Sequence, residues 1–168
     1  DFIRGEEGNA TYGAFIKGAG ENNVMERNVV ICEWKLLGWP GQRVGLSIGG
    51  GGTGELLRRD EGRSGVEQAG GVVRDNLIAY CSDVAVYVNK GIRSVIEHNT
   101  LLDTAGIDVR FPESSAEVNF NIVDGVIRTR DGGVVRAFGN QSSPLLGLFL
   151  GYHPVRSLFR EPERLNLR

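Results

Sequence analysis

Six polar residues alternate with apolar ones in three short segments of the chain, and their chemistry suits the recognition of an acidic sugar. We call this set the polar stripe; it consists of Tyr87, Asn89, Asp108, Arg110, Arg128 and Arg130. The planar guanidinium of arginine binds a carboxylate through two parallel hydrogen bonds, and a uronate sugar offers such a carboxylate. The polar stripe therefore predicts a binding surface for an acidic polysaccharide.

A lyase would use this surface in a specific way. It must neutralise the uronate carboxylate so that the C5 proton becomes acidic, and a base must then remove that proton. Arg110 and Arg128 could neutralise the carboxylate, with Arg130 beside them, and Tyr87 or Lys17 could be the base if the positive field lowers its pKa. The candidate catalytic residues are therefore Arg110, Arg128, Tyr87 and Lys17, and the candidate substrate-binding residues include Asn89, Asp108 and Arg130.

Two other interpretations of these residues stay open. A hydrolase would pair Asp108 with Asp103 or Glu113 as acid and base or nucleophile, and the two carboxyl groups would have to lie about 5–9.5 Å apart. The polar stripe could also be an ordinary solvated strand face, in which Asp108 is paired with an arginine.

Two long excursions could wall a cleft beside the polar stripe. The segment from Glu33 to Arg43 carries Trp34 and Trp39, which are further substrate-binding candidates because their rings could stack on sugars. Alternatively, both tryptophans pack their loop onto the body of the protein. The segment from about residue 49 to 68 begins with four glycines and continues with a charged run, so we expect a projecting loop. It lacks the GK[ST] ending of a phosphate-binding loop.

The elements that would position these residues repeat about every twenty-two residues. Each unit, or rung, has a short alternating strand, a turn, a second short strand, an asparagine and a third apolar run, which is typical of a coiled β-solenoid. The asparagines are Asn28, Asn76, Asn99 and Asn121, with Asn140 as a candidate fifth. Stacked at one corner, they would hydrogen-bond the backbone and one another, and asparagine tolerates the left-handed conformation that we expect there.

Alternation within the first strand of each rung predicts which side chains point inward. We expect six core residues there: Leu46, Ile48, Val86, Val88, Ile107 and Val109. The residues between and after them form two outward columns, Ser47, Tyr87 and Asp108 in one and Gly49, Asn89 and Arg110 in the other. Phe15 precedes Asn28 by the same thirteen residues that separate Val86 from Asn99. That alignment would turn Lys17 inward, unless the rung slips by one residue or lies at a solvent-open end.

The corner sequences RNVVI, RDNLI, EHNTLL and NFNIV resemble those of bacterial right-handed parallel β-helix proteins of the pectate-lyase-like kind. The resemblance covers about Gly13 to Asn140, and the tail resembles the LF-x-x-P closing segment of such proteins. It implies an all-β, right-handed parallel β-helix of about five to six coils over residues 1–140. Residues 141–168 would be an irregular closing segment, in which Leu145–Tyr152 could cap the open end. Neither the paired-aspartate motif of polygalacturonase-like hydrolases nor a pectate-lyase calcium site is matched.

The composition of the chain limits which classes of binding partner the protein could have. The chain has 168 residues and a formal net charge of −2, which suits one domain and gives no sign of a nucleic-acid partner. No apolar run approaches the ~20 residues that cross a bilayer, so we expect no membrane partner.

Cys32 and Cys81 fall near the same corner of successive rungs, where we favour two buried thiols over the alternative of a disulfide. The first residue, Asp1, fits either a mature exported protein or a piece of a longer solenoid.

No set of histidine and carboxylate residues has the spacing of metal ligands, so we predict neither a metal site nor a cofactor. A calcium ion would have to be bound by scattered loop oxygens. His98 is expected to be a structural residue at a corner, and His153, in the tail, to be incidental.

The sequence therefore favours an exported protein, secreted or periplasmic, that acts as a lyase on an acidic polysaccharide. The alternative is a non-catalytic carbohydrate-binding or structural β-helix module, which could belong to a larger protein. An uncapped N-terminal rung would also allow self-association into a homo-oligomer.

Overall fold

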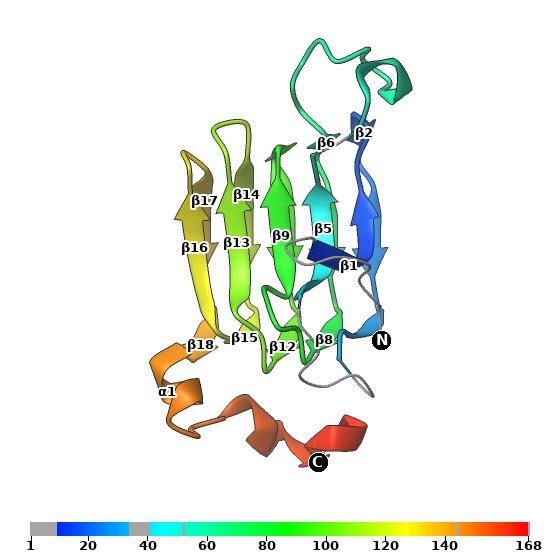
Figure 1. The fold of residues 1–168 in the computed structure, drawn as a ribbon. Coiled ribbons are helices and arrows are strands. Elements are labelled where there is room, and N and C mark those ends of the chain that lie inside the picture. The colour runs from blue at the N-terminus through cyan, green and yellow to red at the C-terminus, as the bar shows by residue number, and fades with distance from the viewer. Residues whose placement is uncertain (1–9, 34–40, 52, 144, 168) are drawn as a thin grey trace.

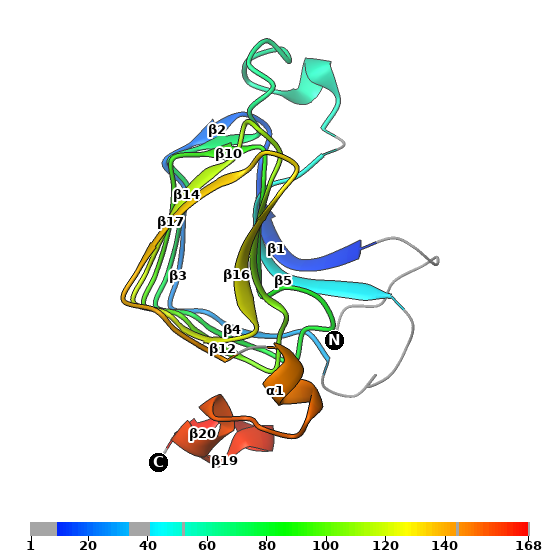
Figure 2. The same cartoon turned by 90° about the vertical axis from the view of Figure 1, so that its left-hand side faces the viewer.

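The structure is a computed structural model that describes residues 10–33, 41–51, 53–143 and 145–167. It is all-β, and its parallel strands are stacked in sheets, which is consistent with the predicted parallel β-solenoid. At each corner the chain passes to the next sheet, and it returns to the first sheet one rung further along (Figures 1 and 2).

Four parallel sheets hold the stacked strands of the described residues. The first sheet has the order β1 (Ala10–Ile16), β5 (Gln42–Gly49), β9 (Val86–Asn89), β13 (Gly106–Arg110) and β16 (Val126–Arg130). The short sheet consists of β2 (Gly20–Glu21), β6 (Gln68–Ala69) and β10 (Gly91–Ile92). The second sheet contains β3 (Val24–Glu26), β7 (Val72–Arg74), β11 (Ser94–Glu97), β14 (Ser115–Asn119) and β17 (Val134–Phe138). The third sheet contains β4 (Val29–Ile31), β8 (Leu77–Ala79), β12 (Thr100–Leu102), β15 (Ile122–Asp124) and β18 (Gln141–Ser143).

The core lies between the sheets and is built from files of apolar side chains. In the first sheet, Leu46 pairs with Val86, and Val86 with Ile107. All six residues that alternation placed inward are at most 1% exposed, which confirms that prediction. They pack against inward residues of the second and third sheets, among them Ile96 and Leu101. Each such burial contributes roughly 1.5–3 kcal/mol, so the files hold the rungs in register.

The asparagine ladder is confirmed, including its fifth member. The Nδ2 group of Asn76 donates to Oδ1 of Asn99 at 2.9 Å, and Asn99 repeats this contact with Asn121 at 2.9 Å. Asn28 and Asn140 extend the ladder at its two ends through equivalent bonds of 2.9 Å. The amides of Asn76, Asn99, Asn121 and Asn140 also donate to backbone carbonyls, so the ladder stabilises the corner.

The left-handed backbone conformation occurs one residue earlier than predicted. The residues with positive φ at this corner are those that precede each asparagine: Arg27, Asp75, His98, Phe120 and Gly139. All five residues are exposed, four of them with a side chain, and the His98 ring is stacked on Phe120 with centroids 5.6 Å apart. The asparagine itself is free to point inward because its neighbour makes the turn. His98 is thus a corner residue, as expected.

The first rung is offset by one residue from the predicted alignment. Phe15 pairs with Ser47 and Ile16 with Ile48, so Phe15 lies in an outward column and is 53% exposed. Aligning Phe15 with Val86 was therefore wrong. Residues 17–19 separate Ile16 from β2, whereas only residues 89–90 separate Val88 from β10. One extra residue in this corner accounts for the slip, and it leaves Lys17 out of the core.

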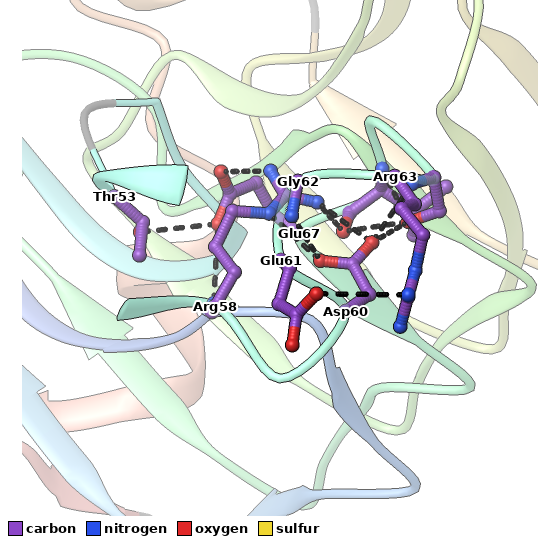
Figure 3. A network of polar contacts seen from close by, with 10 residues as sticks. Thr53, Arg58, Asp60, Glu61, Gly62, Arg63 and Glu67 are labelled. Atoms are coloured by element: carbon purple, nitrogen blue, oxygen red, sulfur yellow. Dashed lines mark hydrogen bonds and ion pairs between the residues drawn. The ribbon is translucent and has the colours of Figure 1, made fainter. Parts of the chain in front are cut away.

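The segment between β5 and β6 is a projecting loop, as predicted, with one short 3-10 helix, η1 (Glu55–Leu57) (Figure 1). Figure 3 shows the polar network that organises it. Arg58 donates to Oε1 of the buried Glu67 at 2.9 Å and to Oδ1 of Asp60 at 3.0 Å. Hydrogen bonds from Arg58 and Ser64 hold the pKa of Asp60 well below its usual range. The loop is therefore folded on itself by charge pairs rather than by an apolar core.

The two cysteines form a disulfide, so the favoured interpretation of two free thiols was wrong. Cys32 and Cys81 follow β4 and β8, and their Cα atoms are 4.8 Å apart. Both residues are buried, at 0% and 4% exposure. The bridge joins two rungs that are 49 residues apart in sequence, because the long loop intervenes.

The C-terminal segment covers a side of the stack rather than its end. Residues Gln141–Ser143 still belong to the third sheet as β18, so the repeat runs beyond the predicted boundary at residue 140. The remaining elements are α1 (Leu145–Phe149), η2 (Val155–Leu158), β19 (Phe159–Glu161), η3 (Pro162–Arg164) and β20 (Asn166–Leu167). Buried Val155 and Phe159 pack on Ala79 and Leu102 of the third sheet. The predicted cap from Leu145 to Tyr152 thus lies beside the third sheet (Figure 2).

Helices are short throughout the described residues. None of them has both the length and the hydropathy that crossing a bilayer takes.

Candidate functional site

The polar stripe runs down the outward face of the first sheet in the predicted register. In one column Tyr87 pairs with Asp108, and Asp108 pairs with Arg128. In the other column Asn89 pairs with Arg110, and Arg110 with Arg130. Successive rungs lie about 4.8 Å apart, so residues more than twenty positions apart in the chain become neighbours.

Asp108 is the centre of the polar stripe. It is 0% exposed, and its Oδ2 atom accepts hydrogen bonds from Arg128 at 3.1 Å and from Arg130 Nε at 2.7 Å. The terminal nitrogen of Arg130 lies 2.6 Å from the same oxygen. The interaction with Asp108 raises the pKa of Arg130. Three short contacts converge on one carboxylate oxygen, which makes Asp108 the internal counterion of two arginines.

Several buried polar atoms of the polar stripe have no hydrogen-bond partner among the described residues. Oδ1 of Asp108, Oδ1 of Asn89 and Nε of Arg128 are buried, and none of the described residues forms a hydrogen bond with them. Such groups cost free energy unless something else satisfies them, and they are uncommon outside functional sites. The polar stripe therefore has hydrogen-bonding capacity that the fold does not use.

Five stripe residues line a single small cavity of about 230 Å³. They are Tyr87, Asn89, Asp108, Arg110 and Arg130. Five residues that the sequence analysis did not identify share the cavity: the apolar Val44 and Val84 and the polar Tyr12, Gln42 and Asp83. Tyr12 and Gln42 reach it because β1 and β5 extend beyond the strands expected from alternation, as Figure 2 shows. Asp83 comes from the turn before β9, where the sequence carries no repeated signal.

The cavity is lined by both neutral and charged polar side chains. Burial, then the neighbouring Tyr87 and Asp83, raise the pKa of Tyr12, so its phenol stays neutral at physiological pH. Arg110 forms an ion pair with the exposed Asp131, and this bond, followed by one to Tyr87, raises the pKa of the guanidinium. Its Cζ atom also lies 4.6 Å from the centroid of the Phe111 ring. The cavity thus offers phenol, amide, carboxylate and guanidinium groups within a few ångströms.

Lys17 does not join the other candidate catalytic residues. Its ammonium lies over the ring of Phe15 at 4.8 Å from the centroid, and it does not line the cavity with Tyr87 and Arg110. Two rungs separate it from Asn89 in the column. Trp34 and Trp39 fall outside the described residues. Tyr87 is thus the candidate base that the structure places beside the arginines.

The carboxylate pairs considered for a hydrolase are not brought together at this cavity. Asp103 follows β12 and binds Arg156 and His153 of the C-terminal segment. It lines a different cavity from Asp108. Glu113 lies in the turn after β13 and does not line the cavity of the polar stripe. A second carboxylate near Asp108 is supplied instead by Asp83.

The two excursions leave β5 at its opposite ends. The described part of the first ends at Gly41, just before β5 begins, and the loop that contains η1 starts after Gly49, where β5 ends. Gly49 has φ +78°, and a side chain there would place its Cβ 2.0 Å from the carbonyl oxygen of Asn89. Only glycine fits this position, and it leaves the stripe without a side chain beneath the loop.

Comparison of the chain with protein-family models, with curated proteins and with solved structures finds no match. The geometry of the polar stripe is therefore what indicates a function for this chain.

Chemically, the arrangement suits recognition of a hydroxylated anion. The unpartnered oxygens of Asn89 and Asp108 are buried, so they would accept hydrogen bonds from sugar hydroxyls after the surrounding side chains move. Arginine carries five N–H donors, and Arg130 uses only Nε and one terminal nitrogen on Asp108. Its side chain is 43% exposed, so it retains donors that face solvent.

Proposed function

We propose that the chain is an exported carbohydrate-binding module whose polar stripe binds an acidic polysaccharide. The observation that carries the proposal is that Asn89 and Asp108, whose buried oxygens bond no described residue, line one cavity. A saccharide supplies hydroxyl donors for Asn89 and Asp108, and its carboxylate pairs with the exposed donors of Arg110 and Arg130. A chain of sugars repeating every ~5 Å would match the rung spacing.

Binding without catalysis accounts better for the charges of the polar stripe than a lyase does. A lyase needs cations that are free to neutralise the substrate carboxylate as charge develops. Here Arg128 and Arg130 share Asp108, and Arg110 is paired with Asp131. These internal counterions weaken the positive field at the cavity. The sequence-based preference for a lyase therefore becomes the second candidate.

One observation keeps the lyase as that second candidate. Tyr87 lines the same cavity as Arg110, so a phenol and a guanidinium face the same small volume. In this mechanism Arg110 would bind the uronate carboxylate and Tyr87 would remove the C5 proton.

The finer details of fold and location follow from the same proposal. We infer that the stack is a right-handed parallel β-helix of about five to six coils, similar in architecture to the pectate-lyase-like group. The disulfide between Cys32 and Cys81 supports export to a secreted or periplasmic location, because disulfides persist in oxidising compartments.

Affinity electrophoresis in gels that contain polygalacturonate, alginate or chondroitin tests the proposal. We expect the protein to be retarded by at least one of these polymers. The double variant Arg110→Gln/Arg130→Gln should lose about tenfold in affinity for each arginine, since a hydrogen bond to a charged group contributes about 1.5–3 kcal/mol. Arg136→Gln is the matched control, because Arg136 is an exposed arginine on β17 of the second sheet.

Two results would overturn the proposal: no retardation by any of the polymers, or retardation of the double variant equal to that of the wild type. Ultraviolet absorbance of the unsaturated product separates binding from lyase activity in the same samples. If product forms and Tyr87→Phe abolishes it while retardation persists, the lyase replaces the binding module.

A further inference from the structure

A second polar cluster lies at the other side of the stack, where the C-terminal segment meets the third sheet. Asp103 follows β12, Asp124 ends β15, and His153 lies between α1 and η2. One ligand atom of each residue lies within 4.8 Å of the other two. Sequence spacing did not predict this group, because its members come from two rungs and from the tail.

The existing contacts hold the cluster together but leave it incomplete. Nδ1 of His153 lies 2.9 Å from Oδ1 of Asp103, and Arg156 donates to Oδ2 of Asp103 at 2.8 and 2.6 Å. Oδ2 of Asp124 accepts the backbone N–H of Asp103 at 3.1 Å. Arg156 thus neutralises and orients Asp103 from outside the cluster, as partners of metal ligands commonly do.

Asp124 provides an observation that is independent of the clustering. The residue is 0% exposed, and its Oδ1 atom is buried without a hydrogen bond from any described residue. Burial raises the pKa of this carboxyl group. An isolated buried carboxylate is costly, and buried charges in proteins are normally paired or coordinate a metal.

The cluster also has a route to solvent. Asp103, His153 and Arg156 line a cavity of about 540 Å³ between the third sheet and the C-terminal segment, together with Tyr80 and Phe149. An ion could therefore reach Asp103 and His153 from this cavity, whereas Asp124 lies behind them and is fully buried.

We propose that Asp103, Asp124 and His153 bind a divalent transition-metal ion such as zinc, which clasps the C-terminal segment to the third sheet. One imidazole nitrogen and two carboxylate oxygens are ligands that zinc accepts at about 2.0–2.2 Å, and such a set leaves one position for water. Imidazole disfavours calcium and magnesium, which take oxygen ligands. The three ligand atoms already lie within 4.8 Å of one another, so an ion bound among them would join the C-terminal segment to the third sheet.

A metal ion bound at this cluster would order the part of the C-terminal segment that apolar contacts with the third sheet hold only weakly. Val155 and Phe159 anchor the segment, whereas Leu146, Phe149 and Leu150 are more than 70% exposed. His153 lies between these two groups, so an ion bound there adds a cross-link where packing is weakest. This inference does not depend on the polar stripe or on the proposed function.

Thermal unfolding of the full chain, stripped with EDTA and titrated with zinc chloride, tests the proposal. We expect the unfolding midpoint to rise by about 5–10 °C at a zinc concentration one hundred times the dissociation constant. Calcium chloride at the same concentration should produce little shift. Cleavage of the segment around Gly151 by a protease should also slow when zinc is present.

The chain contains two histidines, which provides a matched pair of variants. His153→Gln should remove the zinc-induced shift, whereas His98→Gln, at the exposed ladder corner, should retain it. Asp124→Asn should also remove the shift; if that variant does not fold, His153→Gln alone decides, because it changes only the tail. The proposal is overturned if zinc produces no shift in the wild type, or if His153→Gln responds as strongly as His98→Gln.

Discussion

The asparagine ladder and the polar stripe are both files of polar side chains that recur from rung to rung, yet they use their hydrogen-bonding groups differently. In the ladder, Asn76, Asn99 and Asn121 are at most 2% exposed, and their amides pair with the next amide and with backbone groups. In the polar stripe, Asn89 and Asp108 keep buried oxygens that no described residue satisfies. The file whose hydrogen-bonding groups are all paired stabilises the fold, and the file with unpaired groups has hydrogen-bonding capacity left for a ligand.

Exchanging amide and carboxylate between the two files provides the strongest test of this difference. The Nδ2 group of Asn99 donates to the carbonyl oxygens of Val73 and Glu97 at 3.0 Å and to Oδ1 of Asn121 at 2.9 Å. Asn99→Asp replaces this donor by a carboxylate oxygen, which would then face three other acceptor oxygens. It also buries a charge without a partner. We expect a loss of at least about 4 kcal/mol in the free energy of unfolding, measured by urea denaturation.

Asn140→Asp is the matched control, because Asn140 ends the ladder and is only partly buried. Its loss should be about 1–2 kcal/mol. Equal losses for the two variants would contradict the view that stacking between neighbouring amides sets the strength of the ladder.

The disulfide allows the contribution of the ladder to be separated from that of a covalent link. Asn28 and Asn76 precede β4 and β8, whereas Cys32 and Cys81 follow the same two strands, so the ladder and the bridge hold opposite ends of these strands. Replacing both cysteines by alanine should lower the free energy of unfolding by about 2–4 kcal/mol, given the 49-residue separation. Dithiothreitol should lower the urea midpoint of the wild type and leave that of the double variant unchanged; a wild type insensitive to reduction would refute the bridge.

The smallest change in stability is expected from Asp108→Asn in the polar stripe. The substitution removes a buried carboxylate, and its partners Arg128 and Arg130 are 37% and 43% exposed, so water can solvate them. We expect a loss of about 1 kcal/mol or less, in contrast to the exchange at Asn99. Affinity for an acidic polysaccharide should rise severalfold, because both arginines lose their internal counterion. A loss comparable to that of Asn99→Asp, measured in the same urea series, would make the polar stripe a stability element as well.

Sequence pattern predicted the repeating part of the fold because the physics there is local and periodic. Inward alternation at Leu46, Val86 and Ile107 and the recurrence of asparagine before each third strand both follow from the stacking of rungs. The same logic misaligned Phe15, where one extra residue in a corner shifts the strand; the inward lysine at position 17 that the alignment required was the sign of this slip.

The candidate sites were harder to predict because they combine residues from outside the repeat. Tyr12 reaches the stripe cavity through a strand extension, and Asp83 through a turn that occurs in one rung. His153 meets Asp103 and Asp124 only because the tail packs against the third sheet. Contacts of this kind depend on tertiary packing, and periodicity contains no information about them.

The left-handed residue before each ladder asparagine has a consequence for protein engineering. Four of these positions, those of Arg27, Asp75, His98 and Phe120, carry exposed side chains, while the neighbouring asparagine makes the hydrogen bonds that hold the corner. Any residue type that accepts positive φ could be substituted there, and β-branched types are the ones to avoid. The row would then display dyes, charges or aromatic rings at intervals set by the backbone, as the stacked rings of His98 and Phe120 already do.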